Sequence, residues 1–144
     1  PPDPLSAEVT LHASCVAIGG QGVLIIGPAG SGKSSLALAL MALGAGLVAD
    51  DRTRITPAGS GLVASCPETI SGLIEARGLG LLRAAPAGPT PLGLVVDMGQ
   101  TEEDRLPPFR HFRLAGRTIP LVHSQRNPHF PAALMQYVRG GRHA

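Results

Sequence analysis

The sequence has few of the residues that mark several large classes of protein. Its 144 residues include no tryptophan, one tyrosine and three phenylalanines, so the core must be built mainly from leucine, valine, isoleucine and alanine. No apolar run approaches the roughly 20 residues that span a bilayer. The Pro-Pro-Asp-Pro start does not resemble a signal peptide. We therefore expect a soluble, cytoplasmic protein without a membrane partner.

Net charge is also low. Twelve basic and ten acidic residues give a formal charge of +2, and the arginines are scattered along the chain. A nucleic-acid-binding surface requires clustered positive charge, so we expect no nucleic-acid partner. Lys33 is the only lysine, and the other eleven basic residues are arginine. An ammonium group retained in so arginine-rich a chain indicates a position where a compact charge is needed.

Residues that form disulfides or bind transition metals are sparse. Cys15 and Cys66 lie in apolar or turn surroundings without a Cys-x-x-Cys pair, which predicts buried free thiols. The histidines lack ligand spacing, and only His12 is kept as a functional candidate. The length favours one domain over residues 1–144, with an irregular leader over 1–8 and an irregular tail over 140–144.

The most informative stretch is a glycine-rich segment that follows the apolar run Val23–Ile26. It has the complete Walker A pattern, Gly-x-x-x-x-Gly-Lys-Ser, between an expected strand and an expected helix. The amides of such a loop surround phosphate oxygens, Lys33 reaches the β and γ phosphates, and the Ser34 hydroxyl ligates the accompanying Mg²⁺. The expected nucleotide-binding residues are Gly27, Pro28, Ala29, Gly30, Ser31, Gly32, Lys33, Ser34 and Ser35.

The rest of the chain predicts an α/β protein with many turns. Alternating apolar residues over 9–18 predict a strand that forms a β-hairpin with the strand before the loop. Leucines at helical spacing predict a helix over 35–43, and a short buried strand follows over 46–49. Further expected elements are a hairpin over 53–64, a short helix over 67–74, strands over 92–98, 109–114 and 118–122, and a helix over 131–139.

Phosphoryl transfer also needs a carboxylate near the metal and a group that takes a proton from the attacking oxygen. Asp50 and Asp51 follow one buried strand, and Asp97 follows another. Adjacent carboxylates at a strand end can divide these two tasks, which favours Asp50 and Asp51 over Asp97. Capping of a turn by both aspartates is the alternative.

Taken together, these motifs resemble the HPr kinase/phosphorylase family. The resemblance rests on His12, the Walker loop, the sequence Ala-Asp-Asp ending at Asp51, and Glu-x-Arg-Gly-Leu-Gly beginning at Glu75. It covers residues 11–127. It implies an α/β P-loop kinase domain with a mixed central sheet flanked by few helices and preceded by a β-hairpin. It also implies an ATP- and Mg²⁺-dependent protein-serine kinase of the bacterial phosphotransferase system, with the phosphocarrier HPr as substrate and phosphorolysis of phosphoserine as the reverse reaction.

The resemblance also implies roles for individual residues. Asp50 is the general base for the substrate serine and Asp51 lies beside it, while Glu75 holds magnesium together with Ser34. His12 matches a histidine near the phosphate, and Arg126 matches an arginine on a loop. The expected catalytic residues are therefore His12, Lys33, Asp50, Asp51 and Arg126, and the expected metal ligands are Ser34, Asp51 and Glu75.

The chain departs from the family pattern at two loop positions. Pro28 stands where an aspartate is usual, and Ser35 where an acidic residue is usual. The length resembles the short proteobacterial form, which corresponds to the kinase domain alone, and the family assembles as a hexamer. A small-molecule P-loop kinase and a non-catalytic ATP-binding switch protein are the alternatives. The sequence favours a GTPase still less, because the Asn-Lys-x-Asp motif for guanine needs a lysine besides Lys33.

Overall fold

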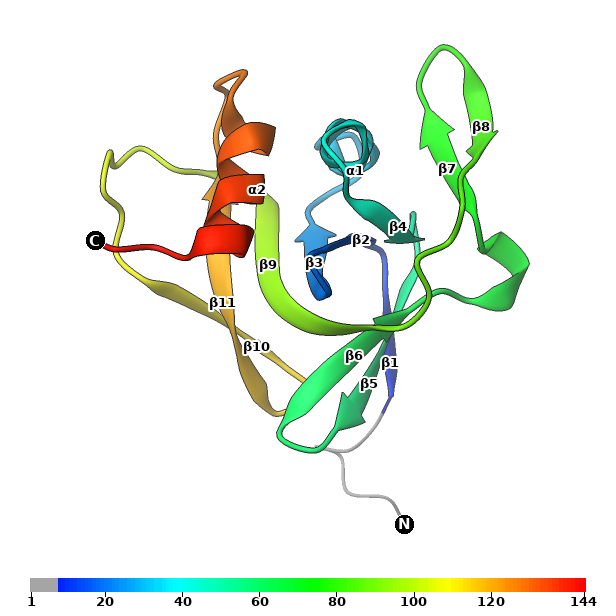
Figure 1. Ribbon diagram of the computed structural model, residues 1–144, viewed down its shortest axis with the longest axis horizontal. Helices are drawn as coiled ribbons and strands as arrows, with labels where there is room; N and C mark the ends of the chain where they lie inside the picture. The colour runs from blue at the N-terminus through cyan, green and yellow to red at the C-terminus, as the bar shows by residue number, and fades with distance from the viewer. Residues whose placement is uncertain (1–7) are drawn as a thin grey trace.

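The structure, a computed structural model, describes residues 8–144, so the leader expected over residues 1–8 lies outside it apart from Glu8. Within the described part, two helices flank a curled mixed sheet (Figure 1). The elements in chain order are β1 (Val9–Leu11), β2 (Ser14–Ile18), β3 (Gln21–Ile26), α1 (Lys33–Ala42), β4 (Gly46–Ala49), β5 (Thr53–Ala58), β6 (Gly61–Ser65), a 3-10 turn (Glu68–Ile70), β7 (Leu73–Ala76), β8 (Gly80–Arg83), β9 (Thr90–Thr101), β10 (Arg110–Leu114), β11 (Arg117–Ser124) and α2 (Phe130–Gly140).

Strand β9 holds the sheet together. Its middle pairs parallel with β3 on one edge and with β11 on the other, through Val95 and Val96 in both cases. Its first residues pair antiparallel with β6, and the strand bends between these partners (Figure 1). Because both faces of its middle are covered, residues 94–96 form a continuous apolar run.

Successive residues of the central strands enter two separate cores. Val23 and Ile25 of β3 pack in a cluster with both helices, whereas Leu24 packs on the opposite face with residues of β5, β6 and β10. This alternation is the two-residue period of a strand. Helices α1 and α2 therefore pack on one face of the sheet, and strands β1, β5 and β6 lie near the other face.

The predicted α/β fold with a hairpin before the loop is confirmed. Strands β2 and β3 pair antiparallel from Ser14↔Ile25 to Ile18↔Gln21, around two glycines with positive φ. One correction concerns residues 9–18, which form two strands rather than one. The chain turns at His12 and Ala13, so that β1 pairs with β5 while β2 pairs with β3 and β4.

Two further boundaries differ from the sequence prediction. The expected helix over 67–74 is only one 3-10 turn, because residues 73–76 pair with β8 as a separate two-stranded sheet. The expected tail over 140–144 overlaps the end of α2 at Gly140.

The predicted free thiols are confirmed, although Cys66 is only half-buried. Burial raises the pKa of the Cys15 thiol to about 12, so this thiol stays protonated at neutral pH.

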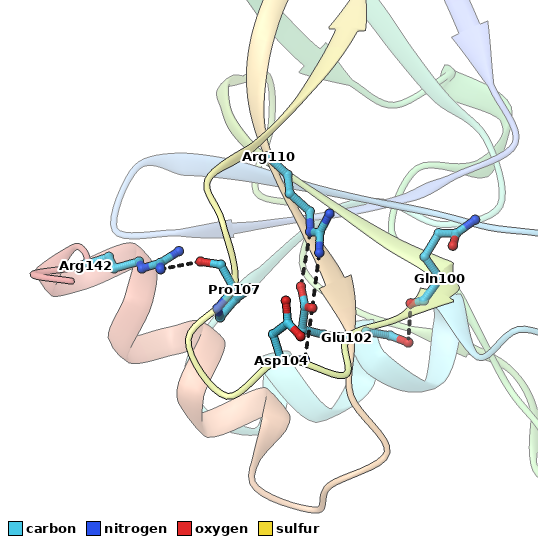
Figure 2. A network of polar contacts seen from close by, with 7 residues as sticks. Gln100, Glu102, Asp104, Pro107, Arg110 and Arg142 are labelled. Carbon is cyan, nitrogen blue, oxygen red and sulfur yellow. Dashed lines mark hydrogen bonds and ion pairs between the residues drawn. The ribbon is translucent and has the colours of Figure 1, made fainter.

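Arginine side chains form hydrogen bonds with both ends of the loop between β9 and β10 (Figure 2). Arg110 donates two hydrogen bonds to the carboxylate of Glu102, at 3.1 and 3.2 Å, and this lowers the pKa of Glu102. Arg142, beyond α2, donates to the carbonyl of Pro107 and lies 4.2 Å from the ring centroid of Phe109. The loop and α2 line a hollow of about 410 Å³.

No helix of residues 8–144 is long and apolar enough to cross a membrane.

Candidate active site

The glycine-rich segment forms a phosphate-binding loop between β3 and α1. Gly27, Gly30 and Gly32 have φ values of +148°, +79° and +96°, and the Ser31 amide donates to the Pro28 carbonyl at 3.1 Å. Helix α1 begins at Lys33 without a side-chain cap or an acidic residue in its first turn. The first amides of α1 are therefore available to an anion, which is the arrangement that binds phosphate.

Gly27 is required by close packing as well as by its backbone angle. A Cβ atom there would lie 2.7 Å from Ser31 Oγ, 3.0 Å from Met98 Cβ and 3.2 Å from the Gly99 amide nitrogen. We expect Gly27→Ala to lower the free energy of unfolding by about 2–3 kcal/mol, measured by urea denaturation. Gly59→Ala is the control, because Gly59 also has positive φ but has nothing within 4 Å. Equal losses for the two variants would contradict the packing argument.

Two side chains of the loop suit a bound polyphosphate. Lys33 Nζ donates to the carbonyls of Gly27 at 2.7 Å and Pro28 at 3.1 Å, so the ammonium lies against the loop. Ser31 Oγ is buried and has no hydrogen-bond partner among the described residues. A buried hydroxyl without a partner is costly, and a phosphate oxygen would satisfy it. The loop therefore fits a nucleotide phosphate group.

The two aspartates after β4 lie in different environments. Asp50 is 5% exposed and accepts three hydrogen bonds: from the hydroxyls of Ser14 and Ser34, both at 2.7 Å to Oδ1, and from the Glu75 amide at 2.9 Å to Oδ2. Asp51 is exposed and has a φ of +67°. The Arg52 amide donates to the Asp50 carbonyl at 2.8 Å and closes a three-residue turn around Asp51. Such strained turns are concentrated at functional sites.

A hollow of about 540 Å³ lies over the loop, and most of the predicted site residues line it. Asp51 and Glu75 supply carboxylates to it, and Ser34 supplies a hydroxyl. These are hard oxygen donors, and Mg²⁺ commonly takes one or two carboxylates plus substrate phosphates. No group of three or more His, Cys, Asp or Glu side chains within residues 8–144 forms a metal site by itself. The donor set therefore fits a magnesium ion that arrives with a nucleotide.

Not all predicted residues reach the hollow. His12 lines it, but Arg126 lies exposed in the segment between β11 and α2 and is absent from its lining. Ser31 and Asp50 are also absent from the lining, and Asp50 is joined to it through the Ser34 hydroxyl. Asp97 ends the pairing of β9 with β3, and its Oδ1 accepts a hydrogen bond from the Gly99 amide at 2.8 Å. Because Asp50 and not Asp97 contacts Ser34 of the loop, the geometry favours the Asp50–Asp51 pair.

Two residues of the site were missed by sequence reasoning. Ser14 is fully buried on β2, lines the hollow and bonds Asp50. Arg77 also lines the hollow, although only Glu75 of the Glu-x-Arg-Gly-Leu-Gly sequence was expected in the site. A serine within the apolar strand 13–18 is the only local signal that could have indicated the first residue.

Comparison with known proteins identifies similar chains. A family model described as the HPr serine kinase C-terminal domain matches residues 3–87. The HPr kinase/phosphorylases of Bordetella pertussis and Xanthomonas campestris pv. campestris (strain B100) are 44% and 51% identical to this chain over 79 residues, which is 54% of the chain. These segments are 26% and 25% of the relatives, so the match spans about a quarter of their length.

A solved structure extends the similarity to almost the whole chain. The Hpr(Ser) kinase/phosphatase from Coxiella burnetii superposes with a TM-score of 0.77 and is 27% identical. The alignment covers 91% of this chain and 94% of that structure. The family model matches only residues 3–87, so this similarity extends well into the segment after residue 87, which holds β9, β10, β11 and α2.

Proposed function

Since the chain belongs to the family of HPr serine kinase C-terminal domains, we propose that it transfers the γ-phosphoryl group of ATP to a serine of an HPr-type phosphocarrier protein. The same site would catalyse the reverse phosphorolysis of phosphoserine. The observation that carries the proposal is the hydrogen bond between Ser34 of the loop and Asp50, with Asp51 exposed beside it. This arrangement joins a phosphate cradle to two carboxylates with different surroundings. A cytoplasmic location follows from this proposed partner.

The chain's own residues divide the work of the reaction. Bound magnesium-ATP supplies the transferable phosphoryl group and a cation that offsets negative charge. The loop amides and Lys33 hold the phosphates, and Ser34 and Glu75 are the residues that would hold the metal. Lys33 also offsets charge that develops during transfer, because it is the cation that the loop itself supplies.

We assign the proton-accepting role to Asp51, whereas the family resemblance assigned it to Asp50. Asp50 is buried, and both of its oxygens already accept hydrogen bonds from the protein. Asp51 is exposed to the hollow where a substrate hydroxyl must arrive. In the forward reaction Asp51 takes the serine proton as the serine oxygen attacks the γ phosphorus and ADP leaves. In phosphorolysis, inorganic phosphate attacks the phosphoserine phosphorus to form pyrophosphate, and protonated Asp51 gives a proton to the leaving serine oxygen.

Mass spectrometry of HPr after incubation with this protein and magnesium-ATP tests the function. Phosphoserine on HPr is the expected product. Phosphorylation of a metabolite from a parallel panel, with HPr unmodified, would instead indicate a small-molecule kinase. Nucleotide binding without transfer to either would indicate a switch protein.

The rim of the hollow favours a protein substrate over a small molecule. Strand β7 carries Glu75, which lines the hollow, and Leu81 of β8 is its direct cross-strand partner. Opposed residues share one face of a two-stranded sheet, so Leu81 flanks Glu75. Leu81 is 64% exposed, and Leu79 at the turn is 80% exposed. This hairpin projects beside α1 (Figure 1), where a macromolecule that brings a serine to the loop would contact it.

Leu81→Ser is expected to raise the KM for HPr roughly tenfold and to leave kcat and ATP affinity unchanged, because a buried leucine contact is lost from the complex. Steady-state kinetics with HPr as the varied substrate measures this. Leu106→Ser is the matched control, since Leu106 is also 64% exposed but belongs to the loop between β9 and β10. In Figure 1 this loop and the β7–β8 hairpin lie on opposite sides of the two helices. A change in oligomeric state with KM unchanged would assign the leucines to contact between copies of this chain.

A further inference from the structure

Ser14 carries a fully buried hydroxyl in the otherwise apolar strand β2. Its neighbours Ala13, Cys15 and Val16 are each 0% exposed, as is Ser14 itself. Burying a hydroxyl in such surroundings is unfavourable unless it is hydrogen-bonded. Ser14 Oγ donates to Asp50 Oδ1 at 2.7 Å, and no other hydrogen bond of this hydroxyl is described. The hydrogen bond to the Asp50 carboxylate is therefore what satisfies the buried Ser14 hydroxyl.

The same carboxylate oxygen also accepts the hydrogen bond of Ser34, at 2.7 Å. A serine hydroxyl that ligates a cation through a lone pair still has a proton to donate. The acceptor of that proton determines the direction in which the lone pairs point. Asp50 therefore orients Ser34, and it can do so only if its own carboxylate is held in one direction.

Three segments hold that carboxylate. Ser14 of β2 and Ser34 of α1 meet at Oδ1, and the Glu75 amide of β7 donates to Oδ2 at 2.9 Å. If Ser34 shifts toward a metal, Ser14 is the remaining side-chain donor on Oδ1. Ser14 also stands on a rigid support, because its backbone pairs with Ile25 in the central hairpin that leads into the loop.

We propose that Ser14 is a positioning residue for the magnesium site: it holds Asp50 so that Asp50 directs the Ser34 hydroxyl oxygen to the metal. The proposal rests on the proposed function in so far as the site takes a magnesium-nucleotide. Outer residues that orient a metal ligand commonly contribute a factor of 10–100 to metal affinity. Ser14 acts through Asp50 and contacts neither the metal nor the substrate.

The test is a titration of Mg²⁺ at a fixed concentration of a fluorescent ATP analogue, which reads binding and not turnover. Ser14→Ala is expected to raise the Mg²⁺ concentration at half-saturation by about tenfold, with nucleotide binding in EDTA unchanged. Ser14→Thr keeps the hydroxyl and is expected to remain within about twofold of the wild type. It also carries the test if Ser14→Ala does not fold.

Thr53→Val is the matched control. Thr53 is likewise 0% exposed, and the described hydrogen bond of its hydroxyl goes to the carbonyl of Ala13, the residue before Ser14, at 2.8 Å and not to Asp50. This variant is expected to lose stability without a change in Mg²⁺ dependence. Folded Ser14→Ala with wild-type Mg²⁺ dependence, or an equal shift in Thr53→Val, would overturn the proposal. If the wild type binds magnesium-nucleotide but leaves HPr unmodified, the proposed function fails while the role of Ser14 stands.

Discussion

Asp51→Asn is expected to lower the rate of phosphoryl transfer to HPr by about 10²–10⁴-fold, the usual contribution of a general base. An asparagine keeps the size of the side chain and tolerates the positive φ of residue 51, but it cannot take a proton. Asp51 was also expected to ligate the metal, but the proposed mechanism assigns the metal to Ser34 and Glu75, and the described hydrogen bond of Ser34 goes to Asp50. Nucleotide binding should therefore stay near the wild-type level, and a loss of Mg²⁺-dependent binding would return Asp51 to the metal. Single-turnover transfer and equilibrium nucleotide binding measure the two quantities separately.

Asp50→Asn provides the contrast. The Glu75 amide can only donate, so the asparagine oxygen must face it, and the asparagine amide group must then face Ser14 and Ser34. The Ser34 proton thereby loses its acceptor, and we expect Mg²⁺-dependent nucleotide binding itself to weaken at least about tenfold. The opposite pattern, with binding lost in Asp51→Asn and only transfer lost in Asp50→Asn, would return the base to Asp50 as the family resemblance implied.

Local patterns explain which parts of the fold were predictable. The hairpin before the loop, the loop itself and strand β4 each depend on a short run of residues: alternating apolar positions, glycines or a buried run. The expected strand over 92–98 lies within β9. It could be predicted because the middle of β9 is covered on both faces and therefore has a continuous apolar run. The ends of β9 could not be predicted, since Thr90 and Pro91 pair with β6 from a distant part of the chain.

The division between Asp50 and Asp51 could not be obtained from their adjacency. Which of two neighbouring carboxylates is buried depends on donors from β2, α1 and β7, and these segments are far apart in sequence. Ser14 was missed for the same reason, because its partner lies 36 residues away. Arg126 shows the converse: a motif match gave it a role, yet it is absent from the lining of the hollow among the described residues.

Lys33→Met is expected to reduce phosphoryl transfer by about 10²–10³-fold, the usual effect of removing one group that stabilises transition-state charge. The reason is specific to this chain: Lys33 is its only lysine, and the ammonium lies within 3.1 Å of two loop carbonyls, beside the amides that would hold the phosphates. Rapid-quench measurement with HPr and magnesium-ATP gives the rate. Lys33→Arg should recover little, because a planar guanidinium on a longer side chain does not fit the place of a compact ammonium.

The single lysine also allows a test of its position by chemical modification. Lys33 is the only lysine side chain that an amine-reactive reagent can modify in this sequence, so the mass of the peptide that contains it reports its modification directly. Magnesium-ATP is expected to protect Lys33, since the nucleotide phosphates would pair with the ammonium within the loop. Equal modification with and without nucleotide, together with full transfer by Lys33→Met, would mean that the phosphates are held elsewhere. The roles assigned to Ser34, Asp50 and Asp51 depend on phosphate bound in this loop, so that result would overturn all three.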